Sequence, residues 1–403
     1  MNAPLMSFEA ALEALLGAAG TVSETESIAT EDALGRVLAR PLRASLNVPP
    51  ADNSAMDGYA VRTADIPDAG TTLPVSQRII AGATGEALAP GTAARIFTGA
   101  LIPAGCDAVV MQENTQLEGE RVRINELPAP GQNIRRAGED IAAGSDVIVA
   151  GSALGPAALG LAASLGEARL EVRRRLRVAI FFTGNELVMP GAALGPGQIY
   201  NSNRFVLRAL LAQLGCEFTD LGIVRDSLDE TRQALRRAAD GHDLVLTCGG
   251  VSVGEEDHVK AAVEAEGALS LWKIAIKPGK PLAFGRLGDA DFIGLPGNPV
   301  SAFVTFLTLV CPYILKRQGR GDIAWQATEH VAAFDWPRPD SRREFLRARL
   351  NAEGRVETHP RQGSGVLSAC AWADGFVDLA PRQQVKAGDT VRYLAFSDLG
   401  GLL

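Results

Sequence analysis

The segment from Cys248 to Lys260 combines glycines with acidic side chains, and both could take part in handling a phosphate. A β-like run ends there, three glycines follow within six residues, and a helix-like run begins. Glycines let a bound group approach the backbone, and the exposed N–H groups at a helix start attract anions. A phosphate cradle and an ordinary tight turn both fit this pattern. The candidate contacts are Gly249, Gly250, Ser252 and Gly254.

The acids of the same segment, Glu255, Glu256 and Asp257, stand where a helix start stabilises negative charge in any protein. A phosphate site that also holds a carboxylate suits Mg²⁺, which bridges phosphate oxygens and one or two carboxylates. The chain contains neither G-x-x-x-x-G-K-[ST] nor G-x-G-x-x-G. This absence disfavours an ordinary ATPase or a dinucleotide-binding enzyme.

Three lysines, Lys273, Lys277 and Lys280, lie within eight residues at and after the end of another β-like run. Lysines in such a place could neutralise a pyrophosphate or another oxyanion. Most lysines are simply exposed, so a solvated loop is the alternative. Pro278 and Pro281 restrict this loop, which favours a functional role.

Further polar groups follow other β-like runs. Pro296-Gly297-Asn298-Pro299 forms a rigid elbow before a helix, since proline restricts itself and the residue before it. Glu186 closes the run Thr183-Gly184-Asn185-Glu186, and Asp226 follows another strand. Ligands of open α/β sheets bind at the carboxyl ends of strands. These strand ends therefore predict one composite site.

The elements that must position these residues alternate between strand and helix from about 175 to 320. This rhythm predicts a mostly parallel sheet with helices on both faces. The expected strands are 177–182, 243–247, 272–276 and 292–295. The expected helices are 203–214, one after the capping box Ser227–Glu230, one from about 257, and a long apolar helix after Pro299.

The flanking segments differ from this α/β rhythm. Ser7 should cap a helix beginning at Phe8, a second helix is expected from Ile28 to Ala39, and a third, 157–165, could pair with the first. Residues 50–135 read as a β-rich insert containing a hairpin at 117–122, and the last 75 or so residues as a small β-sandwich or barrel. We divide the chain into a helical/linker domain (1–48 and 136–174), a β-rich insert (49–135), an α/β domain (175–326) and a C-terminal β-barrel domain (327–403).

Composition limits the function classes. The 403 residues suggest two to four domains, and the net charge of −8 argues against a nucleic-acid coat or an anionic-membrane protein. Five scattered cysteines and four separated histidines disfavour disulfides and a zinc site, so a metal would have oxygen ligands. The first basic residue is Arg36, and the longest apolar run, 303–315, is shorter than a membrane span. We therefore expect a cytoplasmic protein.

Two motifs lie outside the α/β region. Residues 52–61, D-N-S-A-M-D-G-Y-A-V, form an unusually polar run, although Asn, Ser and Asp could simply make turns. Residues 135–141, R-R-A-G-E-D-I, follow the β-rich insert and could be an exposed ion-paired loop.

Together these runs resemble the molybdopterin molybdenumtransferases, a family similar to the E domain of gephyrin. The matching runs are D-N-S-A-M-D-G-Y-A-V (52–61), R-I-F-T-G (95–99), G-E-D-I (138–141), G-G-V-S-V-G-E-E-D (249–257), K-I-A-I-K-P-G-K-P (273–281) and G-L-P-G-N-P-V-S-A (294–302). They occur in the family's order over residues 7–403. The resemblance implies that adenylylated molybdopterin and molybdate are the substrates and that Mg²⁺ assists release of AMP.

The resemblance also implies an elongated homodimer whose cleft lies between the α/β domain of one subunit and the first half of the other. An adenylyltransferase could supply the substrate, and molybdoenzymes could receive the product. By motif, the resemblance assigns catalytic roles to Asp57, Thr98, Asp140, Glu186, Asp226, Asp257, Lys273 and Lys277. It assigns ligand contacts to Arg135, Lys280, Pro296, Gly297, Asn298 and Pro299. It assigns the binding of Mg²⁺ to Glu186, Asp226 and Asp257.

One position departs from the family pattern, because Asn185 stands where T-G-D-E-L often has aspartate. Two other functions are compatible with parts of this pattern. A molybdopterin adenylyltransferase would resemble the α/β region but would not need the other 250 or so residues. A non-catalytic scaffold of the same fold could lose its charged cleft residues, whereas this chain keeps nearly all of them.

Overall fold

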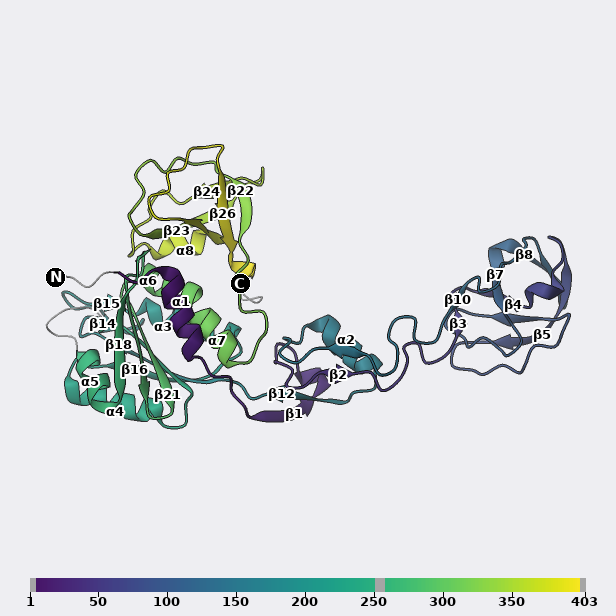
Figure 1. Ribbon diagram of the computed structural model, residues 1–403, viewed down its shortest axis with the longest axis horizontal. Helices are drawn as coiled ribbons and strands as arrows, with labels where there is room; N and C mark the ends of the chain where they lie inside the picture. Colours follow the sequence, from purple (N-terminus) through teal and green to yellow (C-terminus); the bar gives the residue numbers. More distant parts are fainter. Residues whose placement is uncertain (1–4, 251–257, 399–403) are drawn as a thin grey trace.

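The computed structural model describes residues 5–250 and 258–398 and shows an elongated molecule (Figure 1). One end carries an α/β unit with a C-terminal β unit beside it. A small middle segment leads from there to a β-rich insert at the far end. The predicted multidomain architecture is confirmed, whereas the exact domain boundaries stay a prediction.

The α/β unit contains a six-stranded sheet that is parallel on one side and antiparallel on the other. Its order is β16 (Glu217–Val224), β13 (Arg177–Thr183), β17 (Leu244–Cys248), β21 (Ala290–Leu295), β20 (Pro281–Leu287) and β18 (Ala268–Lys273). The first four strands run parallel, and β20 and β18 are antiparallel to their neighbours. The short turn at Gly288 joins β20 and β21 as a hairpin, which requires antiparallel pairing.

Helices cover both faces of this sheet, as predicted. Alternate residues of β13 pack on opposite sides: Ile180 belongs to the core beneath α3 and α6, and Phe181 belongs to the core beneath α4 and α5. Strands buried on both faces read as continuous apolar runs, which is why 177–182 lacks alternation. The helices are α3 (Ser202–Gln213), α4 (Leu228–Ala239), α5 (His258–Glu266), α6 (Pro299–Thr305) and α7 (Cys311–Arg317).

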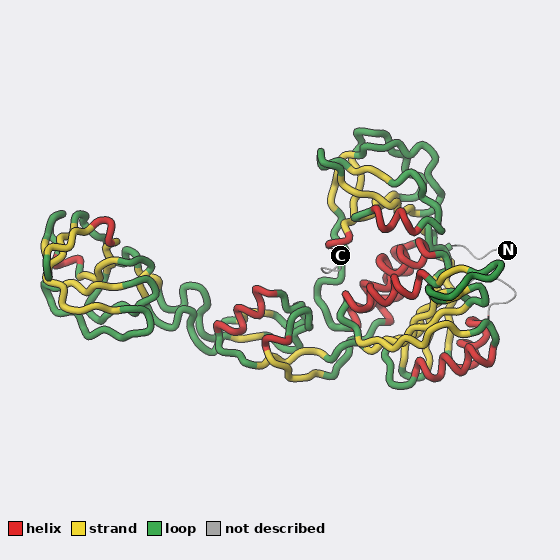
Figure 2. The backbone as a smooth tube through the Cα atoms, turned by 180° about the vertical axis from the view of Figure 1, so that it is seen from behind, coloured by secondary structure: helices red, strands yellow, loops and turns green. Residues whose placement is uncertain are grey.

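The helix after Pro299 continues through a π-helical turn (η4, Phe306–Val310) into α7, so residues 299–317 form one helical stretch. By length and composition these 19 residues could cross a membrane, which corrects the shorter sequence estimate. However, 89% of the most apolar window is buried inside the protein. The apolar character is therefore explained by the core, where the stretch lies between the sheet and the C-terminal β unit (Figure 2).

Helix α1 (Phe8–Ala18) begins where predicted, with the Ser7 hydroxyl accepting a hydrogen bond from the Ala10 N–H. The expected pairing with the third helix is wrong, because α1 packs on α7, and Leu15 belongs to the α/β core. The helix expected at 28–39 is also wrong. Strand β1 (Thr25–Ala29) pairs there with β12 (Arg169–Arg173), and Gly35 has a φ of +72°, which a right-handed helix excludes.

The middle segment and the insert contain short elements. Helix α2 (Pro156–Ser164) matches the expected third helix, and it lies beside the pair β2 (Leu42–Arg43) and β11 (Asp146–Ile148). The insert sheet has the order β7 (Ala108–Met111), β4 (Gly58–Val61), β6 (Ala93–Ile96), β5 (Thr72–Ile79), β9 (Arg121–Ile124) and β8 (Thr115–Glu118). The β8–β9 pair confirms the predicted hairpin. At its base, β3 (Asn53–Ser54) pairs with β10 (Ile134–Arg135).

The C-terminal β unit is joined to the α/β unit by a strand. Its sheet has the order β19 (Ile276–Lys277), β23 (Arg343–Leu350), β25 (Gly375–Leu379), β26 (Thr390–Ala395) and β22 (Thr328–Val331), with β24 (Val356–Thr358) on β23. Strand β19 comes from the segment 274–280 that follows β18 and contains Lys277 and Lys280, which we call the lysine loop. The lysine loop is therefore shared between the two units. Helix α8 (Leu367–Trp372) faces the α/β helices, and β14 (Leu187–Val188) pairs with β15 (Ile199–Tyr200) near α3.

Candidate functional site

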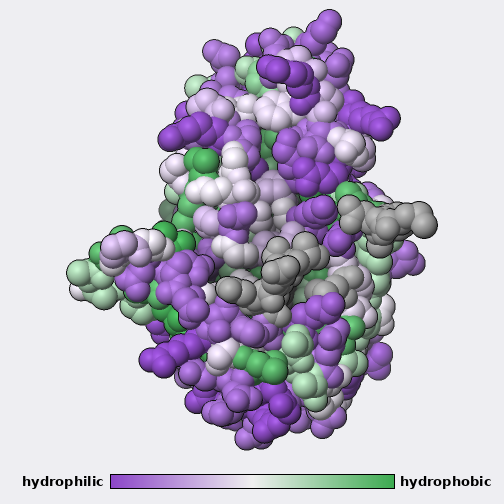
Figure 3. All heavy atoms as spheres, turned by 90° about the vertical axis from the view of Figure 1, so that its left-hand side faces the viewer, coloured by the Kyte–Doolittle hydropathy of each residue, from purple (hydrophilic) through white to green (hydrophobic). Residues whose placement is uncertain are grey.

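A polar cleft lies at the carboxyl ends of β13, β17 and β21, where the sequence predicts a composite site. Its volume is about 520 Å³, and Thr183, Glu186, Asp226, Gly249 and Gly250 line it together with the elbow 296–299. Figure 3 turns the left-hand side of Figure 1 toward the viewer, and hydrophilic residues cover much of that face. The structure thus brings together residues from four separate strand ends.

The two glycines after β17 are required by the packing of the turn. Gly249 has a φ of +98° and Gly250 a φ of +65°, both in the left-handed region. A Cβ atom on Gly249 would lie 2.6 Å from the Thr183 carbonyl oxygen, and one on Gly250 would lie 2.4 Å from a methyl group of Val259. Close approach of β13 and α5 accounts for both glycines. The other predicted contacts of this loop, Ser252 and Gly254, lie outside the described residues.

Four buried polar atoms around the cleft have no hydrogen-bond partner among the described residues. They are the Thr183 hydroxyl, Asn201 Nδ2, Asn203 Oδ1 and Asp226 Oδ1. Buried polar atoms in proteins nearly always have a partner, and orphaned ones need an explanation. All four atoms belong to residues that line this one cleft, so several unpaired polar groups of the α/β unit gather around it.

The carboxylates of the cleft are the groups that could hold a cation. Glu186 is exposed, Asp226 is partly buried, and both line the cleft. Asp257, the third expected ligand, lies outside the described residues. Within 5–250 and 258–398, no cluster of three His, Cys, Asp or Glu side chains forms a complete metal site. Oxygen atoms from phosphate and water would therefore have to complete the coordination of a Mg²⁺ ion.

Asn185 has a local structural role in this structure. Its side-chain oxygen accepts a hydrogen bond from the Asp226 N–H at 3.3 Å. This bond joins the turn after β13 to the turn after β16. An aspartate at this position could accept the same bond, so either residue type suits the turn.

The three lysines do not converge on the cleft. The Lys277 Nζ lies 3.3 Å from an Asp340 oxygen and 3.2 Å from a Glu344 oxygen, both in the C-terminal β unit. Glu344 is 1% exposed, so Lys277 is the cation beside a buried carboxylate. Lys273 is partly buried at the end of β18, and Lys280 is exposed. Neither Lys273 nor Lys277 is among the residues that line the cleft.

The second predicted region contains an ordered carboxylate. The Thr98 N–H and the Thr98 hydroxyl both donate to the same Asp57 oxygen, each at 2.8 Å. These two hydrogen bonds hold the pKa of Asp57 below its ordinary value, and the backbone bond has the larger effect. Nearby, the Arg95 guanidinium lies over the rings of Tyr59 and Phe97. Asp57 is therefore a fixed, ionised acceptor at the edge of the insert sheet.

Arg135 and Asp140 lie where the insert joins the middle segment. Arg135 is on β10, opposite Asn53, and the Asp140 N–H donates to the Val48 carbonyl. Figure 1 shows β3 and β10 at the insert, far from the α/β sheet. Within one chain, therefore, the structure does not bring Asp57, Thr98, Arg135 or Asp140 to the cleft.

Sequence reasoning missed two asparagines that line the cleft. Asn201 is the N-cap of α3, and Asn203 donates to the Gly297 carbonyl at 2.8 Å. The Cys248 thiol donates to the Pro296 carbonyl, so the same group of contacts ties the elbow to β17. Burial raises the pKa of Cys248 to about 12, which keeps it a thiol. The signal in the sequence is the run Asn201-Ser202-Asn203 at the start of a helix.

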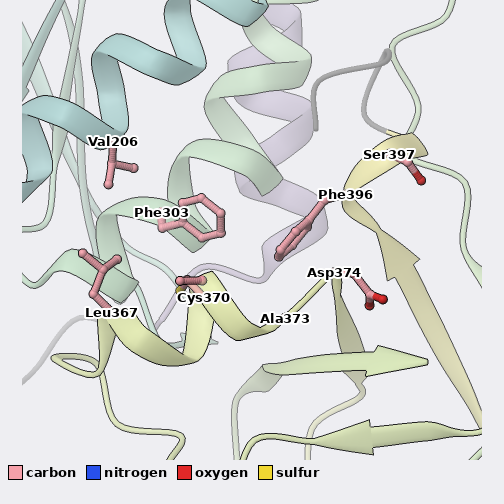
Figure 4. A pocket seen from close by; sticks show the side chains of 9 residues that line it. Val206, Phe303, Leu367, Cys370, Ala373, Asp374, Phe396 and Ser397 are labelled. Atoms are coloured by element: carbon pink, nitrogen blue, oxygen red, sulfur yellow. The ribbon is translucent and has the colours of Figure 1, made fainter. Parts of the chain in front are cut away.

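A second concavity is apolar and lies between α3, α6 and the C-terminal β unit (Figure 4). It measures about 550 Å³, and Phe303, Leu367 and Phe396 form its walls. Asp374 lies at its edge, where its carboxylate already accepts a hydrogen bond from Tyr393. The polar side chains that a catalytic site needs are therefore concentrated in the cleft and not in this pocket.

Three family models match successive parts of the chain. The MoeA N-terminal region (domain I and II) matches residues 6–166, a probable molybdopterin binding domain matches 179–316, and the MoeA C-terminal region (domain IV) matches 329–396.

Relatives and solved structures match nearly the whole chain. A molybdopterin molybdenumtransferase of Haemophilus influenzae is 44% identical over 94% of this chain and 96% of its own length. One of Bacillus subtilis is 35% identical over 94% of this chain and 91% of its own. The crystal structure of the molybdopterin biosynthesis moeA protein from Pyrococcus horikoshii OT3 covers 98% of this chain and 100% of its own. That structure has a TM-score of 0.85 and 28% identity.

Proposed function

The chain belongs to the MoeA family of molybdopterin molybdenumtransferases, and we propose that its cleft binds adenylylated molybdopterin and inserts molybdate with release of AMP. The observation that carries this assignment of the site is the group of four orphaned polar atoms around the cleft. A polar, phosphate-bearing substrate would supply their missing partners. Gly249, Gly250 and the elbow 296–299, which belong to two of the family's α/β motifs, line the same cleft.

Two carboxylates, Glu186 and Asp226, would hold Mg²⁺ against the phosphate oxygens of the substrate. The orphaned oxygen of Asp226 supports this role, because a buried carboxylate oxygen without a donor can coordinate a cation. When bound, Mg²⁺ would neutralise charge on the phosphates. The chain's own part is to orient these oxygens, through the bond from the Asp226 N–H to Asn185.

Lys273 and Lys277 would bind the anionic oxygens of molybdate or of a phosphate group of the substrate. For Lys277 this role involves exchanging partners, because its ammonium group is already paired with Asp340 and Glu344. Its side chain is 42% exposed, so an oxyanion can reach it. A fixed cation at a strand end stabilises negative charge that develops on an oxyanion.

A homodimer would complete the site. Asp57, Thr98, Arg135 and Asp140 belong to the insert or to its junction with the middle segment, and Figure 1 shows the insert strands far from the α/β sheet. A two-fold symmetric pair could place the insert of one subunit beside the cleft of the other. If so, mixing and refolding Asp57→Ala with Asp226→Ala should restore AMP release that neither variant shows alone. Failure of the mixture to regain activity, with dimers present, would contradict shared sites.

The remaining proposals concern setting and partners. We infer a cytoplasmic protein that receives its substrate from an adenylyltransferase and passes molybdenum cofactor to molybdoenzymes. The relatives match along nearly the entire chain, which favours the transferase over an adenylyltransferase confined to an α/β fold. A non-catalytic scaffold is disfavoured by the orphaned polar atoms that remain in the cleft.

One assay tests the proposed reaction directly. Purified protein would be mixed with adenylylated molybdopterin, Mg²⁺ and molybdate, and AMP would be quantified by chromatography. Molybdate-dependent AMP release is the expected result. AMP release that depends on neither molybdate nor Mg²⁺ would refute the proposal, and so would the absence of any AMP release.

A further inference from the structure

The carboxylate of Glu186 folds back over the turn that precedes it. An atom at the Cβ position of Gly184 would lie 2.6 Å from Glu186 Oε2, 2.7 Å from Oε1 and 2.8 Å from Cδ. All three distances are below 3.0 Å, which is closer than real Cβ atoms approach their neighbours. The carboxylate therefore occupies the space that a side chain at position 184 would fill. Both residues line the cleft.

Hydrogen bonds hold the backbone of this turn in place. The Leu187 N–H donates to the Gly184 carbonyl at 3.1 Å, and the Ile199 N–H donates to the Glu186 carbonyl at 2.8 Å. The Asn185 side chain bonds to the turn after β16. The side chain of Glu186 is exposed, so a methyl group added beside it can push the carboxylate aside without opening the core. We therefore expect such a change to move the carboxylate and not the backbone.

Two separate reasons favour glycine at position 184. One is the backbone, because Gly184 has a φ of +145°, which strains any residue with a side chain. The other is the space that the carboxylate occupies. Gly191 distinguishes the two reasons, since it has a φ of +96° and a Cβ atom there would meet no other atom within 4 Å. Alanine at position 191 would have the backbone strain without the displaced carboxylate.

We propose that Gly184 is a positioning residue for the cation ligand Glu186. It leaves the space above its own α-carbon empty, and the Glu186 carboxylate lies there at the cleft. This inference rests on the proposed function, which gives Glu186 its part in holding Mg²⁺. Gly184 itself has no side chain to bind a cation, so its whole effect on the site passes through the position of Glu186.

The test measures binding of a divalent cation without turnover. Mn²⁺, which takes the same kind of oxygen ligands as Mg²⁺, would be titrated into the full-length protein in the presence of AMP. Electron paramagnetic resonance would report the free Mn²⁺. The variants are Gly184→Ala, Glu186→Ala, the double variant that combines them, and Gly191→Ala as the matched control. Thermal melting of each protein would accompany the titrations.

We expect Gly184→Ala to weaken Mn²⁺ binding about tenfold, the usual loss when a group that orients a metal ligand is changed. The double variant should bind Mn²⁺ no more weakly than Glu186→Ala, because the added methyl group then has no carboxylate to displace. Gly191→Ala should bind Mn²⁺ as the parent does. Gly184→Ala and Gly191→Ala should both lower the melting temperature, since alanine is strained at a positive φ.

Three results would overturn the inference alone. One is weaker binding by Glu186→Ala but parental binding by Gly184→Ala. Another is an equal loss in Gly191→Ala, which would mean that backbone strain is responsible. The third is a double variant that binds more weakly than Glu186→Ala by the full effect of Gly184→Ala, which would mean that Gly184 does not act through Glu186. If the parent binds no Mn²⁺, or Glu186→Ala binds it normally, the proposed metal role of Glu186 is refuted, and this inference is refuted with it.

Discussion

Asp226 offers a sharp test because its predicted effects on activity and on stability have opposite signs. One carboxylate oxygen of Asp226 is buried and has no partner among the described residues. Asp226→Asn keeps the shape of the side chain and removes its charge. If Asp226 binds a ligand, the variant should lose AMP release, whereas its free energy of unfolding should not fall.

The magnitude follows from the unpaired atom. A buried polar group without a partner costs the folded state about 1–3 kcal/mol, and more when it is charged. Asp226 is only partly buried, so water screens part of this cost. We therefore expect the free energy of unfolding of Asp226→Asn to be unchanged or higher by up to about 1 kcal/mol.

Asp243 is the matched control at the opposite end of the same sheet. Its carboxylate accepts from Arg174 at 2.8 Å and from the Arg177 N–H at 2.7 Å. Each such bond to a charged group contributes about 1.5–3 kcal/mol. Asp243→Asn should therefore lower the melting temperature by several degrees, while AMP release per folded molecule stays normal.

The assay combines thermal melting with AMP release for the parent and both variants. The expected pattern is an inactive, fully stable Asp226→Asn and an active, destabilised Asp243→Asn. If Asp226→Asn melted as early as Asp243→Asn, Asp226 would be a structural residue. Full AMP release by Asp226→Asn would remove it from the site.

Three more predictions concern other parts of the site. The pKa of Asp57 is lowered, so its carboxylate is charged at and above its ordinary pKa. The charge, and any stability that it contributes to the fold, is lost only as the pH falls through the lowered pKa. Thr98→Val removes one of its two hydrogen bonds, so the acid limb of AMP release and the NMR titration of Asp57 should move to higher pH. Asn185→Asp should keep AMP release, whereas Asn185→Ala should lower it, since only the alanine loses the bond between the two turns; equal rates would contradict this. Lys277→Ala should raise the molybdate concentration needed for half-maximal rate and also lower the melting temperature, because Glu344 is buried beside it.

The sequence predicted those parts of the fold that depend on local patterns. The run 178–182 is apolar throughout because these residues of β13 are buried on both faces of the sheet. Ser7 and Ser227 cap their helices through hydrogen bonds that span only three residues. Where a strand ends is also local, so the polar strand ends of the cleft could be named in advance. These elements are recognisable without knowledge of their partners.

The failures share a cause, which is contact with distant segments. The apolar residues of 28–39 have helical spacing, but β1 pairs with β12, which lies more than a hundred residues further along the chain. Gly35 also has a positive φ, which a right-handed helix excludes. Asn201 and Asn203 look like ordinary capping residues in the sequence. Only the placement of the elbow at Gly297 against α3 shows that Asn203 has a free oxygen.

Lys277 illustrates how such a distant contact changes a chemical argument. From the sequence it is a point charge preset for an oxyanion by neighbouring prolines. In the structure β19 pairs with β23, which places Lys277 between two carboxylates of the C-terminal β unit. The Arg342 guanidinium, above all, holds the pKa of Asp340 well below its ordinary value, so Asp340 is a permanent competitor for the ammonium group. An oxyanion that binds Lys277 must therefore displace a carboxylate, and the position of the C-terminal β unit becomes part of the affinity for molybdate.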